Sequence, residues 1–597
     1  MSIADVIDSV PECVRVKTPP PHCALRMWPG VVLVFAYWAF YAATQVLELP
    51  IYARFMSRMA ANAVLLLLVT AWWFTNRTVR FGERAMLWSL WAIAGVTAGF
   101  LCDRSFGPMG LVFIALPVTL TAWCLWLAVA RRMSAEARRW GTVVAVTGAW
   151  GLFCVVTMDG VTGTGGANIR LRWTRSAEQV YLAERADAKT NTPAATSPKV
   201  DGIELRPGDW AEFRGPLRQG ELRGVTIATD WNTAAPKLVW RQRVGPAWSS
   251  VLIVDGRLFT QEQRGEEEVL VCLDAATGRE IWSHADTTRF SDGQAGAGPR
   301  STPTFADGAI YSLGATGVLN CLDAASGKLR WSRNIANESG APLPMWGFSS
   351  SPLVTDGVVV VYAGGENDKG MLAYDAATGE PMWSVPTGAI SYSSPQKIVR
   401  NGVTEVTLLS DRGLVAVEAA SGKLAWEFAA AKQGIWRAVQ PRQIDRGILI
   451  GSEDLGLVLV DVAAKDQSNP AELWRSKAMK PAYNDFVVLD GFLYGFDDAV
   501  FGCVDLESGK RRWKGGRYGH GQVLLLVDQR LLLVISETGE AVLVAAQPER
   551  LEELGRFQAI QGKTWNHPVV AHGRLYVRND EEIACYDVTA GGESTPR

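Results

Sequence analysis

The apolar residues of this chain are concentrated in its first quarter. They dominate five stretches, Pro29–Leu49, Met56–Phe74, Ala85–Leu101, Met109–Ala130 and Trp140–Met158. Each stretch approaches the ~20 residues that an α-helix needs to cross ~30 Å of hydrocarbon. The stretches have almost no polar outer face, which a soluble helical bundle would need. The pattern therefore predicts a transmembrane bundle of about five helices.

From Trp210 onward the pattern changes to short apolar runs separated by turn residues. These runs repeat with a period of about 40–50 residues, the length of one propeller blade. Each unit closes with a phrase such as LDAATGREIW, which ends at Trp282, or LDAASGKLRW, which ends at Trp331. The Asp and Gly of the phrase suit a tight turn between the third and fourth strands of a blade. We expect the Trp to fill the gap between neighbouring blades, where a large flat ring buries much area.

A second set of turns gives the number of blades. The turns before the second strands are Asp255-Gly256, Asp307-Gly308, Asp356-Gly357, Asn401-Gly402, Asp445-Arg446, Asp490-Gly491, Asp528-Gln529 and His572-Gly573. The last unit stops at Val588 without an outer strand, and an orphan strand, Lys237–Trp240, precedes the first unit. We expect the orphan to complete the last blade and close the ring without an exposed edge. The predicted fold class is an all-β eight-bladed propeller preceded by an α-helical transmembrane bundle.

These patterns divide the chain into five parts. They are a cytoplasmic tail (1–28), the transmembrane bundle (29–158), a linker (159–207), the propeller (208–590) and a short tail (591–597). The linker contains an amphipathic piece, Ile169–Ala183, followed by Ala188–Pro198. The second piece is rich in Ala, Thr and Pro, which is typical of a flexible tether.

Charge indicates the partner class and the orientation. The formal net charge of −2 lacks the basic excess of a nucleic-acid-binding protein, so we expect no nucleic-acid partner. With the N-terminus inside, the outer loops hold only Arg54, Arg58 and Arg104. The cytoplasmic segments hold Arg15, Lys17, Arg26, Arg77, Arg80, Arg84, Arg131, Arg132, Arg138 and Arg139. This bias and an odd number of spans predict a multi-pass protein of the inner membrane, with the bilayer as partner and the propeller in the periplasm.

Four of the nine cysteines follow the repeat. Cys272, Cys321, Cys503 and Cys585 each stand two residues before the turn acid or its equivalent. Other units place Ala or Leu there, which indicates a small buried core position. We expect these cysteines to pack in the core; a disulfide between blades is the alternative in an oxidising compartment.

The first strand of each blade starts near the central axis, so its first residues form the mouth of the channel. The candidate ligand-binding residues there are Arg300, Trp346, Trp436, Arg437, Asn484, His520, Trp565 and Asn566. Aromatic rings offer stacking faces and arginines offer bidentate contacts, which favours a planar, anionic or polyol ligand. Alternatively, the hydroxyl groups of this ring only satisfy backbone groups where eight strands crowd together. We expect Arg300, Trp346, Trp436, Arg437, Asp485 and His567 to converge on one end of the channel.

The repeats resemble the propellers of the pyrroloquinoline-quinone type, the quinoprotein-like and outer-membrane-assembly-like family. The phrases WAEFRGPLRQG from Trp210, GPRSTPT from Gly298, WGFSSSPLV from Trp346 and TWNHPVV from Thr564 carry this resemblance. The layout of five spans before such a propeller is also similar to that of membrane-bound quinoprotein glucose dehydrogenases. The resemblance implies the propeller fold but leaves the activity open.

As a dehydrogenase, the chain would need pyrroloquinoline quinone with Ca²⁺, and Asp485 would be the general base with His520 or His567 assisting. Ca²⁺ prefers several oxygen ligands that include carboxylates. Asp485 is the sole acid of the predicted ring, so we predict no metal-ligand set. The adjacent-cysteine disulfide of the quinoprotein family is also missing from the sequence.

Two functions remain open at this point. The first is a binding or scaffold protein of the cell envelope, whose propeller offers surfaces to envelope proteins or glycans. The alternative is a membrane-bound sugar or alcohol dehydrogenase that feeds electrons to quinone. The low number of acids at the mouth favours the first function, and the five-span layout favours the second.

Overall fold

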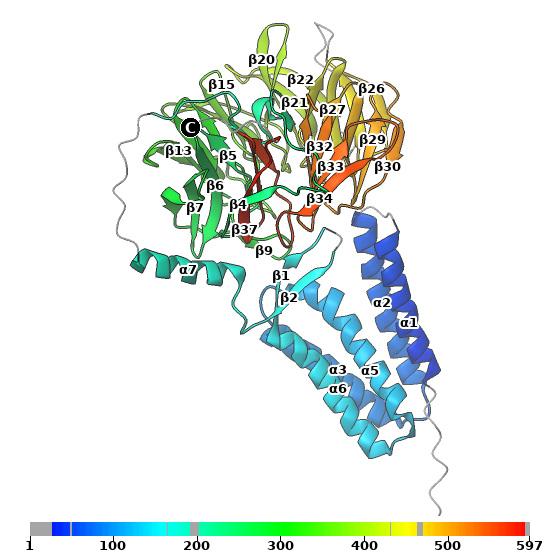
Figure 1. Ribbon diagram of the computed structural model, residues 1–597. Helices are drawn as coiled ribbons and strands as arrows, with labels where there is room; N and C mark the ends of the chain where they lie inside the picture. Colours follow the sequence, from blue (N-terminus) through cyan, green and yellow to red (C-terminus); the bar gives the residue numbers. More distant parts are fainter. Residues whose placement is uncertain are drawn as a thin grey trace, which may run out of the picture. The chain divides into compact units, whose positions relative to one another are not determined.

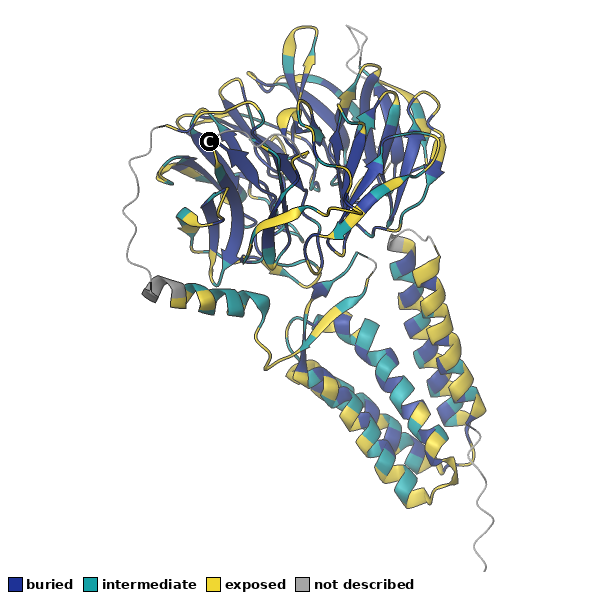
Figure 2. Ribbon diagram, viewed as in Figure 1, coloured by how far each residue is buried: buried dark blue, intermediate teal, exposed yellow. Residues whose placement is uncertain are grey.

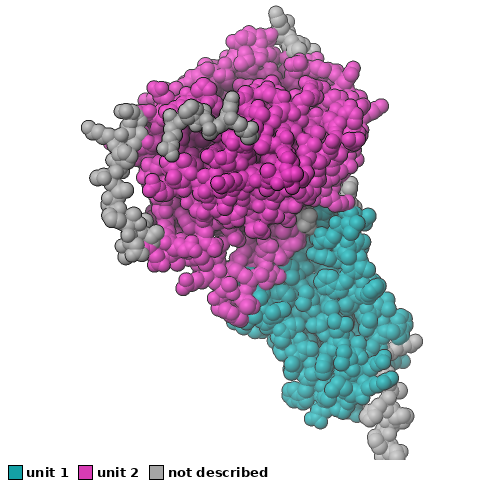
Figure 3. Space-filling model, in the orientation of Figure 1, with its two compact units in different colours: residues 1–157 teal, residues 158–597 magenta. Residues whose placement is uncertain are grey.

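The computed structural model describes residues 27–47, 51–163, 165–191, 202–429, 432–462 and 470–590. The chain forms two compact units, Met1–Thr157 and Met158–Arg597 (Figure 3). The first unit is helical and the second is built from antiparallel sheets (Figure 1).

The helical unit contains the predicted apolar stretches. Its helices are α1 (Trp28–Val46), α2 (Ile51–Thr75), α3 (Phe81–Leu101), α4 (Gly107–Gly110) continued by a π-helical turn (Leu111–Ala115) and α5 (Leu116–Val129), and α6 (Ala135–Val155). Large apolar side chains such as Phe35, Phe100 and Val129 are exposed. Figure 2 shows exposed positions along the helices of this unit in yellow. In a soluble protein such a continuous exposed apolar surface would be unfavourable, whereas lipid can cover it.

Among the described residues, four helical segments are long and apolar enough to cross a membrane. They are Trp28–Val46, Ala53–Thr75, Phe81–Leu101 and Gly107–Arg132. The fifth predicted stretch forms α6, which is not among these four. Glu136, Arg138 and Arg139 in its first turns lower its mean hydropathy. The predicted number of about five spans is therefore approximate.

Two arginines differ from their predicted location. Arg54 and Arg58 lie inside α2, which begins five residues before the predicted span, and both are buried in the bundle. Arg58 donates a hydrogen bond from Nε to Thr44 Oγ1 at 3.0 Å and lies over the ring of Tyr41. Neither belongs to an outer loop, so the predicted charge count on that side rests on Arg104.

The second unit contains eight blades. The strands of the blades are β5–β8 (Leu252–Val254, Arg257–Arg264, Glu267–Asp274, Glu280–Asp286), β11–β14 (Thr304–Ala306, Ala309–Leu313, Val318–Asp323, Leu329–Asn334), β15–β18 (Leu353–Thr355, Val358–Tyr362, Met371–Asp375, Pro381–Val385), β19–β22 (Gln396–Arg400, Val403–Leu409, Gly413–Glu418, Leu424–Ala429), β23–β26 (Arg442–Ile444, Gly447–Ser452, Gly456–Asp461, Ala471–Ser476), β27–β30 (Val487–Leu489, Phe492–Asp497, Val500–Asp505, Arg511–Lys514), β31–β34 (Gln522–Leu526, Leu531–Ile535, Glu540–Ala545, Glu553–Gln558), and β35–β37 with β4 (Val569–Ala571, Arg574–Arg578, Glu582–Asp587, Lys237–Arg243). The predicted eight-bladed propeller is confirmed.

Smaller elements accompany the blades. They are the hairpins β1–β2 (Val156–Val161, Ala167–Leu171) and β9–β10 (Ser291–Asp292, Gly296–Ala297), the helices α7 (Ala177–Asn191) and α8 (Ile335–Ser339), and β3 (Glu221–Leu222), which pairs in parallel with β31.

The ring closes as predicted. β4 pairs antiparallel with β37, and Trp240 lies opposite Cys585 in this register (Figure 1). The orphan strand thus supplies the outer strand of the last blade. Because the two ends of the domain share one sheet, neither end leaves an unpaired edge strand.

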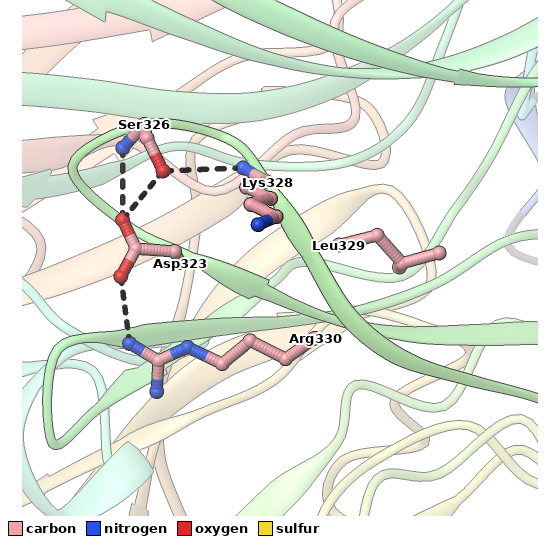
Figure 4. A pocket seen from close by; sticks show the side chains of 5 residues that line it. All are labelled: Asp323, Ser326, Lys328, Leu329 and Arg330. Atoms are coloured by element: carbon pink, nitrogen blue, oxygen red, sulfur yellow. Dashed lines mark hydrogen bonds and ion pairs between the residues drawn. The ribbon is translucent and has the colours of Figure 1, made fainter.

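The closing phrase of a blade folds into a side-chain-capped turn (Figure 4). In the second blade, Asp323 Oδ1 accepts hydrogen bonds from the backbone N–H and the hydroxyl of Ser326, at 3.0 and 2.7 Å. Its other oxygen pairs with Arg330 at 2.8 Å. Gly327 has a φ of +71°, and a Cβ there would lie 2.5 Å from the Trp282 ring of the preceding blade. Both the backbone angle and this close approach require glycine.

The closing tryptophan of a blade docks on the turn of the next blade. Its indole N–H donates to a backbone carbonyl in six cases: Trp240 to Ala275, Trp282 to Ala324, Trp331 to Ala376, Trp383 to Ala419, Trp474 to Leu506 and Trp513 to Gln547. Trp426 instead donates to the Glu405 carboxylate at 2.8 Å. The predicted role of these rings between blades is confirmed, with a directional hydrogen bond added.

The repeat cysteines lie opposite these tryptophans. Cys272, Cys321, Cys503 and Cys585 face Trp282, Trp331, Trp513 and Trp240 across the strand pair, and all four cysteines are buried and free. Each indole ring therefore leaves room for only a small side chain on the neighbouring strand. Burial raises the pKa of Cys321 to about 11, which keeps this thiol protonated and unreactive at neutral pH.

Removing one docking ring should destabilise the propeller. We expect Trp331→Ala to lower the free energy of unfolding by about 3–5 kcal/mol, because a buried indole, its hydrogen bond and its packing on Gly379 are lost together. Urea unfolding of the purified chain measures the change. Trp173→Ala is the control, since that side chain is 70% exposed, and equal effects of the two substitutions would contradict the docking role.

Candidate functional site

Residues two positions before the inner strands connect neighbouring blades by hydrogen bonds. The Ser250 N–H donates to Thr302 Oγ1, the Thr302 N–H to Ser351 Oγ and the Ser351 N–H to Ser394 Oγ, each at 2.9 Å. The Gln440 N–H donates in the same way to the Asp485 carboxylate. These hydroxyl groups satisfy backbone donors between crowded strands, as the alternative interpretation of the ring holds.

Asp485 and His567 belong to a buried group of charges within the channel, here called the channel cluster: Arg214, Arg218, Asp485 and His567. Asp485 Oδ2 lies 3.6 Å from both Arg214 Nε and His567 Nε2. Arg218 donates to the carbonyls of Pro352 and Ser351 at 2.9 and 3.1 Å. The segment Trp210–Gly220 therefore supplies two arginines that occupy the axis of the propeller.

Burial and pairing set the protonation states of this cluster. Burial alone would raise the pKa of Asp485, but the Arg214 guanidinium and His567 hold this pKa below its usual value. Burial lowers the pKa of His567, which outweighs the opposing effect of Asp485. At neutral pH the cluster thus contains a carboxylate, a neutral imidazole and two guanidinium groups.

Aromatic and charged residues form a second cluster at the mouth of the channel. This group is here called the mouth cluster: Trp248, Tyr483, His520, Glu537, Lys563 and Trp565. The Lys563 ammonium lies 4.9 Å from the Trp248 ring centroid and 4.6 Å from that of Trp565. The rings of Tyr483 and His520 stack at 5.2 Å. Burial lowers the pKa of Lys563, although Asp580, Asp292 and Glu537 oppose this effect.

Arg300 anchors a loop of the protein itself. Its guanidinium pairs with Asp292 at 2.5 Å and donates to the Gly296 carbonyl at 2.8 Å. Asp292 in turn accepts the N–H groups of Gln294 and Ala295, both at 2.7 Å. Arg300 therefore fixes the β9–β10 turn at the mouth.

Trp346 and Trp436 lie at the same level in an edge-to-face pair with centroids 5.1 Å apart. Trp346 Nε1 donates to the Gln294 side chain at 3.2 Å, which connects this pair to the β9–β10 turn. The side chain of Arg437 is fully buried, pairs with Asp454 at 2.8 Å and donates to the Ser410 carbonyl at 2.6 Å.

The remaining predicted residues bind neighbouring backbone or the mouth cluster. Asn484 donates to the Gly521 carbonyl, and Asn566 donates to that of Ser249 at 2.7 Å. Trp565 Nε1 donates to Glu537 at 3.0 Å. The structure thus brings Arg300, Trp346, Trp436, His520 and Trp565 around one mouth. Asp485 and His567 lie two positions after Tyr483 and Trp565 in the sequence and belong to the channel cluster with Arg214.

A hairpin of the same chain occupies the mouth. The Gly163 N–H donates to Glu537 Oε1 at 2.5 Å, and the Val161 N–H donates to the Gln294 carbonyl at 2.8 Å. Lys563 donates to the Val161 carbonyl at 3.4 Å. The tip of β1–β2 therefore lies where the sequence analysis placed a ligand.

The segment after the hairpin is also structured where it is described. The predicted amphipathic piece Ile169–Ala183 divides between the end of β2 and the start of α7, and α7 packs on the propeller. Tyr181 donates to Glu262 at 2.7 Å, and Arg185 pairs with Glu280. Part of the predicted tether, 192–198, lies outside the described residues.

Several residues of both clusters were not predicted from the sequence. The phrase WAEFRGPLRQG contains Arg214 and Arg218, and these two arginines close to glycines were the available signal. Lys563 stands next to the phrase TWNHPVV. Glu537 carries no comparable signal, because it follows an ordinary strand end.

Comparisons with known proteins found one family model and several solved structures that are similar to this chain. Residues 265–515 match the family model described as outer membrane protein assembly factor BamB, which confirms the resemblance of the repeats. No curated protein matches. The solved BamB from Moraxella catarrhalis is 15% identical, with 61% of this chain and 100% of that chain covered and a TM-score of 0.44. The quinohemoprotein alcohol dehydrogenase from Comamonas testosteroni is 14% identical, with 70% of this chain and 86% of that chain covered and a TM-score of 0.47. A europium-containing methanol dehydrogenase is 13% identical, with 63% of this chain and 90% of that chain covered and a TM-score of 0.47.

Breaking the buried pair at Arg214 should be costly. We expect Arg214→Ala to lower the free energy of unfolding by about 3–5 kcal/mol, because Asp485 is left as an uncompensated buried charge. Adding Asp485→Asn should recover part of this loss, which urea unfolding of both variants measures. The control is Arg412→Ala, which breaks the half-exposed pair with Glu427 and should cost at most about 1 kcal/mol. If the changes in the free energy of unfolding caused by Arg214→Ala and Asp485→Asn simply add in the double variant, the two side chains do not interact as a pair.

The buried imidazole should make the propeller sensitive to acid. The pKa of His567 lies below its usual 6.5 in the folded protein, so the unfolded chain binds this proton first as the pH falls. The free energy of unfolding should therefore decrease as the pH drops through about 6.5. The decrease should be smaller in His567→Gln, measured by urea unfolding at a series of pH values. Identical pH dependence of both proteins would contradict this assignment.

Proposed function

We propose that this chain is a membrane-anchored binding protein of the cell envelope, whose propeller binds an envelope protein. The apolar helices support the anchor, and the family model matched by residues 265–515 is named for an assembly factor. The observation that carries the proposal is the filling of the axis by the protein's own side chains and hairpin. The residues left for interaction with partners are those of the mouth and the outer loops.

The residues of the axis do not fit the cofactor of the alternative function. Ca²⁺ beside a quinone prefers several carboxylate and carbonyl oxygens. The Asp485 carboxylate already lies against Arg214 and His567 and accepts the Gln440 N–H. A guanidinium group therefore stands where a cation would have to bind, so we assign no catalytic role to Asp485 or His567.

The propeller is proposed to lie on the opposite side of the membrane from the N-terminus. Four qualifying spans alone would return the chain to the side of the N-terminus, so the side depends on α6. This helix has 21 residues and packs against α3 and α5, and its residues from Trp140 to Val155 carry no charge. A helix packed along two membrane spans is best accommodated as a fifth span.

Reconstitution with the quinone tests the binding function against the dehydrogenase. The purified chain is mixed with pyrroloquinoline quinone and Ca²⁺, and unbound quinone is removed by gel filtration. We expect no quinone absorbance to remain with the protein, for the wild type and Asp485→Asn alike. Stoichiometric quinone retained by the wild type and sugar- or alcohol-dependent reduction would establish the dehydrogenase instead.

Fusions to alkaline phosphatase test the topology, because this enzyme folds only outside the cytoplasm. A fusion after Arg597 should be active and one after Arg139 inactive, as an odd number of spans requires. Inactive Arg597 fusions and active Arg139 fusions would overturn the proposed side. Western blots of both fusions control for expression.

A further inference from the structure

The mouth binds its hairpin almost entirely through the main chain. Glu537 accepts the N–H of Gly163, the Gln294 carbonyl accepts the N–H of Val161, and Lys563 donates to the carbonyl of Val161. Glu537 and Lys563 are each 7% exposed. A carboxylate for an N–H and an ammonium for a carbonyl form a site that recognises polypeptide backbone rather than a particular side chain.

The site also selects glycine at the tip of the bound turn. A Cβ on Gly163 would lie 2.2 Å from the His520 ring and 2.9 Å from the Tyr483 hydroxyl. A Cβ on Gly160, whose φ is +113°, would lie 2.6 Å from the Gln294 carbonyl oxygen. Two positions three residues apart thus admit only glycine.

The hairpin leaves part of this site unsatisfied. His520 Nε2 lies 3.4 Å from the Asp498 carboxylate, whereas within the described part of the chain neither the buried His520 Nδ1 nor the buried Tyr483 hydroxyl makes a hydrogen bond. Both side chains contact Gly163, which offers no polar side chain to them. Buried polar groups of this kind normally have partners, so a turn with a polar group next to the glycine would bind better.

We propose that the mouth is a docking site for a glycine-containing β-turn of a partner protein, and that the β1–β2 hairpin occupies this site in its absence. This inference rests on the proposed function and specifies the partner chemistry. The hairpin is covalently held, so its effective concentration is on the order of millimolar, and a partner turn must displace it. β1 begins directly after α6, which connects the occupant of the mouth to the helical unit without intervening residues.

Displacing the hairpin should open the site to a peptide added in solution. The probe is a fluorescein-labelled cyclic peptide of residues 159–170, closed where Asp159 and Arg170 pair at 2.6 Å. Binding to the full-length protein in detergent is followed by fluorescence anisotropy. We expect Gly163→Ala to bind the peptide at least about tenfold more tightly than the wild type, because the competing hairpin is removed.

Matched controls test each contact. Gly166→Ala in the full chain should behave like the wild type, because a Cβ there would meet only Thr162 of the hairpin itself. A peptide with Ala in place of Gly163 should not bind to the Gly163→Ala chain. Adding Glu537→Gln to that chain should weaken binding of the unchanged peptide at least about fivefold, because a hydrogen bond to a charged group is lost. Val161→Pro, which removes the N–H bound to Gln294, is a second displaced variant should Gly163→Ala fail to fold.

Hydrogen exchange of residues 158–170 establishes whether the hairpin has left the mouth. Faster exchange in Gly163→Ala or Val161→Pro together with peptide binding supports the proposal. Faster exchange without peptide binding overturns it but leaves the proposed binding function intact, as does unchanged exchange in both folded variants. Retention of pyrroloquinoline quinone by a displaced variant would overturn both, because the mouth would then be a cofactor chamber.

Discussion

The propeller depends on one contact that recurs at six of its eight blade junctions, the docking of a tryptophan on the turn of the next blade. The indole N–H binds a carbonyl of that turn and the ring covers its glycine, as Trp331 does with Ala376 and Gly379. A directional bond and a close packing contact together fix both the distance and the angle between neighbouring blades. The positions of all inner strands, and hence of every side chain at the axis, follow from this spacing.

A ring of eight blades brings polar strand ends together at its centre, where each must find a partner. Hydroxyl groups such as Thr302 and Ser351 bind backbone N–H groups of adjacent blades, and Asp485 does the same for Gln440. The extra charge of Asp485 is balanced by Arg214 from the segment that precedes the first blade. The central residues therefore hold neighbouring blades together.

The mouth differs from the channel cluster because its partner is a hairpin of the same chain that is bound through main-chain atoms. Three hydrogen bonds hold the hairpin, all of them to its main-chain atoms, and among the described residues His520 Nδ1 and the Tyr483 hydroxyl make no hydrogen bond. The Arg214–Asp485 pair, in contrast, consists of two buried side chains, 4% and 3% exposed. The mouth is thus the place where we propose that a turn of a partner protein replaces the hairpin.

The repeat in the sequence determined the fold: the turn pairs, the closing Trp and the orphan strand before Trp240 predicted eight blades and their closure, because these features act locally or once per repeat. The bundle was predicted less sharply, since apolar length does not separate a span from α6, whose first turns are charged. Only the tertiary structure decided the site. From the sequence we predicted that Arg300 and Arg437 bind a ligand, yet they pair with Asp292 and Asp454 of the same chain. Gly163 lies against Glu537 and His520, which are more than 300 residues away in the sequence. A side chain's partner across hundreds of residues depends on how the ring closes, and no local pattern in the sequence contains that information.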